Sequence, residues 1–179
     1  MKKTKHLIYT SLLVAMALAL HLFERNIPVP FMTPGAKLGL ANLVTVIAIY
    51  TLNKKSDVVK IIVARLLLSA FFGGSLSGLL YGSMGALLSF SIMVVIKEGL
   101  KDQVSTIGVS AAGAVFHNIG QVLVASLIVQ NRGVMLYLPF LSIAGIVTGI
   151  FVGIAANYTV GHMYKLPFFK GMIVKEVRG

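Results

Sequence analysis

Six apolar runs, separated by short polar breaks, organise this chain of 179 residues. The breaks contain lysine, asparagine, glycine and aspartate, residues that are typical of loops. Each run approaches the roughly 20 apolar residues that a helix needs to cross a bilayer. The pattern therefore predicts six membrane-spanning helices and no other domain, with approximate bounds of 7–23, 38–53, 57–73, 76–96, 106–130 and 134–160. The boundary between the third and fourth spans is the least defined, because residues 73–85 are rich in glycine and only weakly polar.

Basic residues fall on one side of this topology. If the N-terminus is cytoplasmic, only Arg25, Lys37 and Arg132 lie outside, and Arg65 lies within a span. The bias fits the positive-inside rule for six spans with both termini in the cytoplasm, and it makes residues 161–179 a basic cytoplasmic tail. The other twelve of the sixteen Lys and Arg residues lie inside: Lys2, Lys3, Lys5, Lys54, Lys55, Lys60, Lys97, Lys101, Lys165, Lys170, Lys175 and Arg178.

Composition supports an all-α integral membrane protein. Hydrophobic residues make up 57% of the chain and charged residues 12%, about half the charge of a soluble domain. The net charge of +11 is spread over membrane-flanking loops without a nucleic-acid motif, so we do not expect nucleic acid as a partner. The basic start and the following apolar run also resemble a signal peptide. We expect the run to be retained, because its loss would leave an odd number of spans.

The stretch from Glu24 to Asn42, ERNIPVPFMTPGAKLGLAN, is unlike its apolar surroundings. Three prolines stiffen it, and it carries the charged residues Glu24, Arg25 and Lys37. Topology places it on the outer face as the first external loop, with Asn42 entering the second helix. Nothing in fold stability requires such a segment, so it is a candidate wall or lid of a ligand pocket.

Small residues repeat at helical spacing on three helices: Ser11, Ala15 and Ala19; Gly74, Gly78 and Gly82; and Gly145, Gly149 and Gly153. Such stripes let helix backbones approach closely in a membrane. Packing within the bundle explains any of them, and docking of a partner protein is the alternative.

Polar residues inside the spans are few. His117 and Gln121 share a face of the fifth span, and Asn118 lies about 100° around the helix. These three either bond neighbouring helices or contact a ligand. Together with Glu24, Arg25, Lys37 and Asn42 they are candidate pocket residues. Asn157 is added to this set, although interhelical hydrogen bonding is its favoured interpretation.

Arg65 lies about 12 Å along a helix from the inner end of its span. We expect its charge to face the protein interior, with Ser69 one turn away, or to reach water on the inner side.

Several kinds of chemistry lack their motifs in this chain. The phosphate-binding pattern G-x-x-x-x-G-K-[ST] of ATPases does not occur. Asp57 and Asp102 are the two aspartates and lie apart, so no carboxylate cluster is available to hold magnesium on a diphosphate. No acidic residue lies near His117 in the sequence for a catalytic triad, no metal-binding cluster is evident, and there is no cysteine. We therefore expect no cofactor, no metal and no catalysis by this chain alone.

Three segments carry a family resemblance: IPVPFMTPGAKLGLANLVT at 27–45, SGLLYGSMGALLSFSIM at 77–93 and GAVFHNIGQ at 113–121. The chain resembles the Gx transporter family of small bacterial membrane proteins, also labelled heptaprenyl diphosphate synthase component I. The resemblance implies a relationship to the S components of energy-coupling factor (ECF) vitamin transporters. Those are six-helix bundles that bind a small molecule from outside and rely on a transmembrane coupling subunit and ATPase subunits. Ser11, Ala15 and Ala19 match their docking face.

The resemblance implies residence in the bacterial cytoplasmic membrane, and it leaves alternative functions. The synthase label implies an accessory, non-catalytic membrane subunit of heptaprenyl diphosphate or menaquinone synthesis. A link of relatives to flavin- or quinone-based extracellular electron transfer implies a membrane scaffold for that system. Outer-side Arg25, Lys37 and Arg132 point to an anionic group on a captured vitamin, cofactor or isoprenoid-related ligand. The residues define neither the ligand, the direction of transport nor the oligomeric state.

Overall fold

The computed structural model describes residues 2–25, 39–72 and 76–169. The regular elements in these ranges are all helical. Six are α-helices: α1 (Lys2–Arg25), α2 (Asn42–Thr51), α3 (Lys55–Phe71), α4 (Leu76–Leu100), α5 (Thr106–Val129) and α6 (Leu138–Met163). Three short 3₁₀ segments accompany them: η1 (Lys101–Gln103), η2 (Arg132–Tyr137) and η3 (Pro167–Phe169).

Local sequence explains where several helices begin and end. Ser105 caps the start of α5 by accepting a hydrogen bond from the Gly108 N–H at 3.2 Å. Gln130 ends that helix in the left-handed conformation, with φ of 51°. Asn131 then accepts a bond from the Gly133 N–H in the turn toward η2, and Pro139 lies in the first turn of α6.

Four of the helical segments in the described ranges are long and apolar enough to cross a membrane. They are Lys3–Glu24, Leu76–Leu100, Thr106–Val129 and Arg132–Met163, the last of which joins η2 to α6. These helices indicate a multi-pass membrane protein, and their positions match four of the six predicted spans. The start of the predicted span 134–160 is 3₁₀ rather than α-helical.

The predicted spans 38–53 and 57–73 correspond to shorter helices. The ten residues of α2 extend about 15 Å, half the roughly 30 Å of a hydrocarbon core. The seventeen residues of α3 include four charged side chains. Neither has the length and composition of an independent span, so the crossing of the membrane by six helices stays a prediction.

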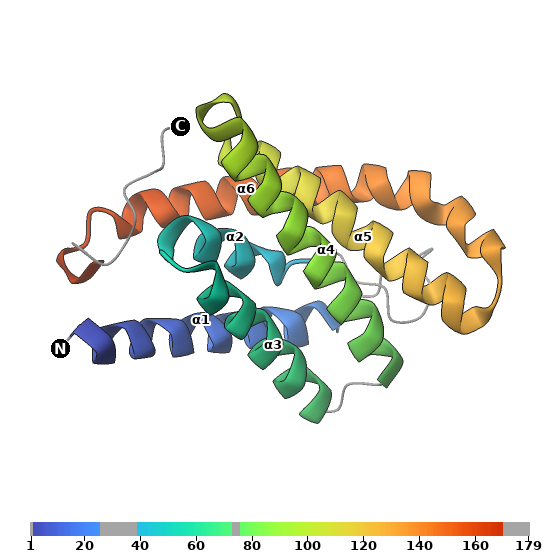
Figure 1. The fold of residues 1–179 in the computed structure, drawn as a ribbon, viewed down its shortest axis with the longest axis horizontal. Helices are drawn as coiled ribbons and strands as arrows, with labels where there is room; N and C mark the ends of the chain where they lie inside the picture. The colour runs from blue at the N-terminus through green and yellow to red at the C-terminus, as the bar shows by residue number, and fades with distance from the viewer. Residues whose placement is uncertain (1, 26–38, 73–75, 170–179) are drawn as a thin grey trace.

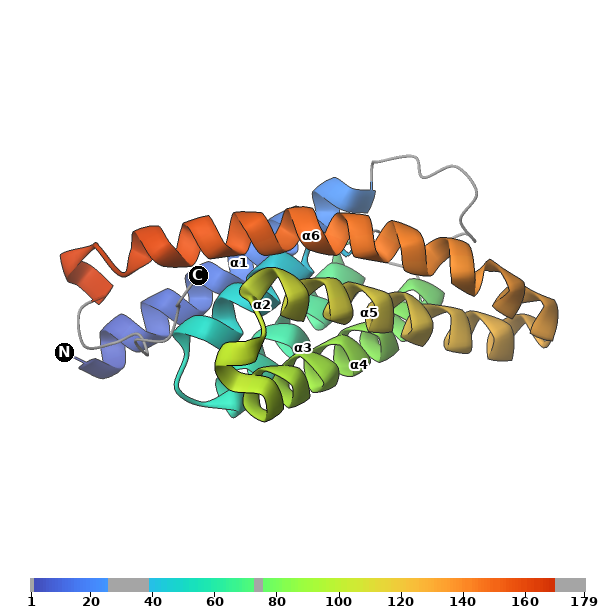
Figure 2. The ribbon, with the colours of Figure 1, turned by 90° about the horizontal axis from the view of Figure 1, so that it is seen from above.

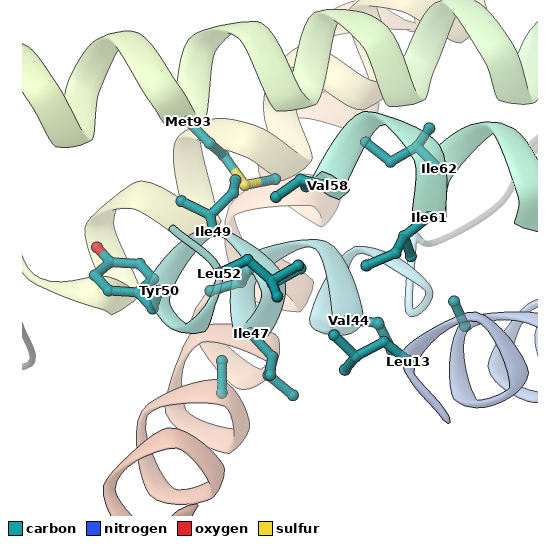
Figure 3. Packing of buried hydrophobic residues seen from close by; sticks show 14 of the residues in the cluster. Leu13, Val44, Ile47, Ile49, Tyr50, Leu52, Val58, Ile61, Ile62 and Met93 are labelled. Carbon is teal, nitrogen blue, oxygen red and sulfur yellow. The ribbon is translucent and has the colours of Figure 1, made fainter. Parts of the chain in front are cut away.

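The short helix α2 lies in the centre of the bundle. Figure 1 shows it between α1 and α6, and it contacts each of the five other α-helices. Nine of its ten residues are buried. Figure 3 shows the core around it, where Val44 lies beside Leu13 of α1, and Ile49 lies near Val58 of α3 and Met93 of α4. The bundle thus shields α2 from lipid on its whole circumference.

The helices α4, α5 and α6 pack as consecutive antiparallel neighbours (Figure 2). The predicted glycine stripe of α6 faces α5: a Cβ at Gly149 would lie 2.5 Å from the Ala111 Cα, and one at Gly153 would lie 2.6 Å from the Ile107 Cα. This stripe therefore serves packing within the bundle. Gly82 is buried beside Leu66 in a similar way, whereas Gly74 lies outside the described residues.

One end of the bundle is closed by contacts between its elements. The start of α1 and the end of α6 lie together there (Figure 1). The Tyr9 hydroxyl and the Thr51 hydroxyl are 2.7 Å apart, and the Tyr9 ring meets Phe169 edge to face. Lys97 donates to the Ile49 carbonyl at 3.0 Å and lies over the Tyr50 ring, where its charge complements the C-terminal end of α2.

Charged side chains reinforce this end. Asp57 accepts bonds from Lys60 at 2.8 Å and from His6 at 3.1 Å, which ties α1 to α3. Lys55 pairs with Glu98 of α4. Because each pair has at least one exposed or partly exposed member, each adds little stability by itself.

The close approach of α5 and α6 predicts a position-specific effect of alanine. Gly149→Ala should lower the free energy of unfolding by about 1–3 kcal/mol, because the added methyl group meets the α5 backbone. The matched control is Gly161→Ala in the same helix, where a Cβ meets nothing within 4 Å. The measurement is unfolding of the purified protein in detergent, and equal midpoints for the two variants would contradict the packing.

Candidate functional site

Residues from five segments, with polar side chains from α1, α3 and α5, meet at the other end of α2, opposite the closed end. They surround a small cavity of about 10 Å³, which has room for about one water molecule. The lining consists of His21 and Glu24 of α1, Gly39 and Ala41 before α2, Arg65 and Leu66 of α3, Gly82 of α4, and His117 and Gln121 of α5. Along α1 the site begins twelve residues after Tyr9, about 18 Å from the closed end.

The turn before α2 brings α1 into the site. Gly39 has φ of 86°, a conformation that favours glycine. Its N–H donates to the Glu24 carboxylate. The Asn42 N–H then bonds the Gly39 carbonyl at 2.8 Å and begins α2. The carboxylate is therefore fixed at the N-terminal end of a helix, where the helix dipole favours a negative charge.

A glycine contact places His117 against α4. A Cβ at Gly120 would lie 2.8 Å from the Gly85 Cα, so α4 and α5 touch through their backbones. A Cβ at Gly85 would in turn lie 2.9 Å from the His117 ring. The Nε2 atoms of His117 and Gln121 are 3.0 Å apart, as expected for residues one turn apart on a common face.

Two buried groups at the site lack hydrogen-bond partners within the described residues. Arg65 is 3% exposed, and its Nε has no acceptor. Asn42 is also 3% exposed, and neither atom of its side-chain amide has a partner. Its Nδ2 would lie 3.1 Å from a Cβ at Gly39. Buried polar groups without partners are costly, so they indicate a place where a ligand or water completes the structure.

The predicted candidates separate into groups. Glu24, His117 and Gln121 line the cavity, and Asn42 lies beside it. Arg25 is the last residue of α1, and its side chain, like Lys37, lies outside the described part of the chain. His21 and Arg65 line the cavity without having been among the predicted pocket residues. A signal for His21 is present in α1, because it continues the buried face of Tyr9, Leu13 and Ala17 at intervals of four residues.

Two asparagines lie away from the cavity lining. Asn118 donates from Nδ2 to the Leu141 carbonyl of α6 at 2.7 Å, so it bonds a neighbouring helix. Asn157 is partly buried one turn beyond Gly153, which packs against Ile107 at the start of α5. Ten residues of α5, about 15 Å, separate Ile107 from His117. Asn157 therefore lies near the closed end.

The small residues of α1 face outward. Ser11, Ala15 and Ala19 are all exposed, while the opposite face of the helix holds the buried Tyr9, Leu13 and Ala17. The bundle leaves this stripe uncovered, in contrast to the glycine stripe of α6. The described residues include no group of three His, Cys, Asp or Glu side chains placed to hold a metal ion.

Comparison with protein families adds an independent observation. The family model described as heptaprenyl diphosphate synthase component I matches residues 13–159. The chain belongs to this family. The matched range contains every residue named above as lining the cavity. No curated protein and no solved structure matches the chain.

The asparagines offer a test of this division between site and bundle. Asn118→Ala should lower the free energy of unfolding by roughly 0.5–2 kcal/mol, because it removes a buried interhelical hydrogen bond. Asn157→Ala, the control at the closed end, should change it by less than about 0.5 kcal/mol. Thermal or denaturant unfolding in detergent measures both, and a larger effect at Asn157 would contradict the assignment.

Proposed function

We propose that this protein is a substrate-capturing membrane subunit, similar to the S component of an energy-coupling factor transporter. In this proposal it lies in the bacterial cytoplasmic membrane with six crossings and both termini in the cytoplasm. The observation that carries the proposal is the buried polar cavity at one end of an otherwise apolar bundle. Ionisable residues at membrane depth are expensive and mark ligand or ion sites.

The asymmetry of the bundle supports capture from one side. The cavity residues Glu24 and Gly39 flank the predicted outer loop, whereas the aromatic and charged contacts close the predicted cytoplasmic end. The start of α1 and the end of α6 lie at the same end of the bundle (Figure 1). This arrangement fits an even number of crossings. A pocket that opens outward and stays closed inward holds a ligand without letting it through.

The present cavity is smaller than a vitamin or cofactor. Sites for such ligands hold about 300–1,000 Å³, so binding requires movement of elements that surround the cavity. Arg65, His117 and Gln121, which line the cavity, would then meet polar groups of the ligand. In this proposal the chain performs no chemical step, and energy for release comes from separate coupling and ATPase subunits.

The exposed stripe of α1 supports a partner protein. Ser11, Ala15 and Ala19 form a smooth face within the membrane that the bundle does not use. Close backbone contact through small residues is a common mode of helix association in lipid. We propose this face as the contact with the transmembrane coupling subunit.

The family description favours a second candidate function. It names a component of heptaprenyl diphosphate synthase, so an accessory membrane subunit of prenyl diphosphate synthesis is the alternative. In that function the chain binds a soluble prenyltransferase and supplies no catalytic group. A scaffold for an electron-transfer complex is a further alternative, with stable protein partners but no captured small molecule.

Gentle purification followed by mass spectrometry separates these functions. We expect a coupling subunit, ATPase subunits and a bound small molecule to accompany the protein. A soluble prenyltransferase in their place, together with altered prenyl products after deletion of the gene, would support the synthase alternative and contradict the transport proposal.

Substitution on α1 tests the docking face. Ala15→Leu should reduce recovery of the coupling subunit at least several-fold, because the larger side chain separates the helices, while the unfolding midpoint stays nearly unchanged. The control is Ala155→Leu at an exposed alanine of α6. Equal recovery with both variants would argue against the proposed face.

A further inference from the structure

Arg65 is a buried cation without a hydrogen-bonded counter-ion among the described residues. Its side chain lines the cavity from α3, and only 3% of the residue is exposed. Ser69, one turn further along, donates its hydroxyl to the Leu66 carbonyl at 2.8 Å. A buried guanidinium requires a hydrogen-bonding partner, and its planar fork of N–H groups matches a carboxylate. Arg65 is therefore placed to donate hydrogen bonds to an anionic group in the cavity.

Glu24 is the acidic side chain that lines the same cavity, and its charge acts on Arg65. Its carboxylate, however, accepts a hydrogen bond from the Gly39 N–H at the start of α2. A helix start attracts anions through its N–H groups and its dipole. The Glu24 carboxylate thus lies at a position where the carboxylate of a bound ligand could also be held.

Asn42 supplies a further unused donor at this position. It is the first residue of α2, and its buried Nδ2 lies against Gly39 without a hydrogen-bond acceptor. Arg65 and Asn42 approach the turn at Gly39 from different helices. Arg65 lines the cavity, and the Asn42 amide lies beside it against Gly39.

The charge of the lining limits the anion. Among the described residues of the lining, Arg65 contributes one positive charge and Glu24 one negative charge, and His21 and His117 are the other ionisable side chains. A diphosphate carries several negative charges and needs more cations or metal ions than the described residues of the lining supply. A single carboxylate matches one arginine.

We propose that this cavity binds one carboxylate group of the captured molecule, with Arg65 and the Asn42 amide as donors, and that Glu24 is the internal competitor that holds the site in the ligand-free state. The inference rests on the proposed capture function and names the chemical class of its ligand. When the ligand binds, its carboxylate takes the place of Glu24 near Arg65. That displacement couples the ligand to the turn before α2, because the same carboxylate holds Gly39.

Acetate is the probe, with inorganic diphosphate and chloride for comparison at equal ionic strength. Unfolding midpoints of the purified protein in detergent are followed as each anion is titrated. We expect a saturable rise with acetate in the wild-type protein and no rise with diphosphate beyond that with chloride. A larger rise with diphosphate than with acetate would overturn the proposal.

Substitutions assign the effect to the two charged residues. Glu24→Gln should lower the acetate concentration at half-saturation about tenfold, because the competitor loses its charge. Arg65→Gln should abolish the saturable rise, and Arg65→Lys should weaken binding several-fold because the fork is lost. The controls Glu98→Gln and Arg132→Gln remove the same charges at exposed positions and should behave as wild type.

The results with the Glu24 and Arg65 variants also test the proposal. Weaker acetate binding in Glu24→Gln would make Glu24 a ligand contact and overturn its role as competitor. An unchanged response in Arg65→Gln would overturn the anion site, and if that variant does not fold, Glu24→Gln and Arg65→Lys carry the test. The measurement uses the isolated protein, so absence of coupling subunits in co-purification leaves it intact, and a failed acetate response leaves the transport proposal intact.

Discussion

A helix of only ten residues, α2, lies at the centre of this bundle, and the need to shield it constrains the rest of the fold. Backbone groups at membrane depth must be bonded within the protein, because lipid offers no partners. The helix α2 bonds its interior backbone groups itself, but in a helix of ten residues the unpaired groups at both ends are a large share, and contacts with the other five α-helices shield them from lipid. Their buried faces, including Leu13, Val58 and Met93, are accordingly directed at α2 (Figure 3).

The same short helix creates the site. A full-length helix would carry its backbone hydrogen bonds through the membrane, whereas α2 begins at Asn42 within the protein, next to Arg65 and Glu24. The cost of burying these charges is offset where opposite charge and a helix dipole meet. Discontinuous helices form ligand sites in transporters for this reason.

Much of the fold was predictable because a membrane imposes length and polarity on each helix. The predicted span 106–130 agrees closely with α5, and 76–96 lacks only the last four residues of α4, where Lys97 returns to the Ile49 carbonyl. At 38–53 the structure shows a helix of ten residues, Asn42–Thr51, because apolar composition alone does not fix how long a helix is. Within α5 the helical period correctly placed His117 and Gln121 on one face, away from Asn118.

The sequence by itself determined the membrane class, the helical periodicity and the family, because these depend on residues near one another in the chain. Only the tertiary structure decided the site. Arg65 lies 41 positions after Glu24 in the sequence and 52 positions before His117, and no local pattern relates their side chains. Backbone contact at Gly85 and Gly120, and the hydrogen bond between Glu24 and Gly39, bring them to one cavity. Such contacts depend on how whole helices pack, which is a property of the assembled bundle.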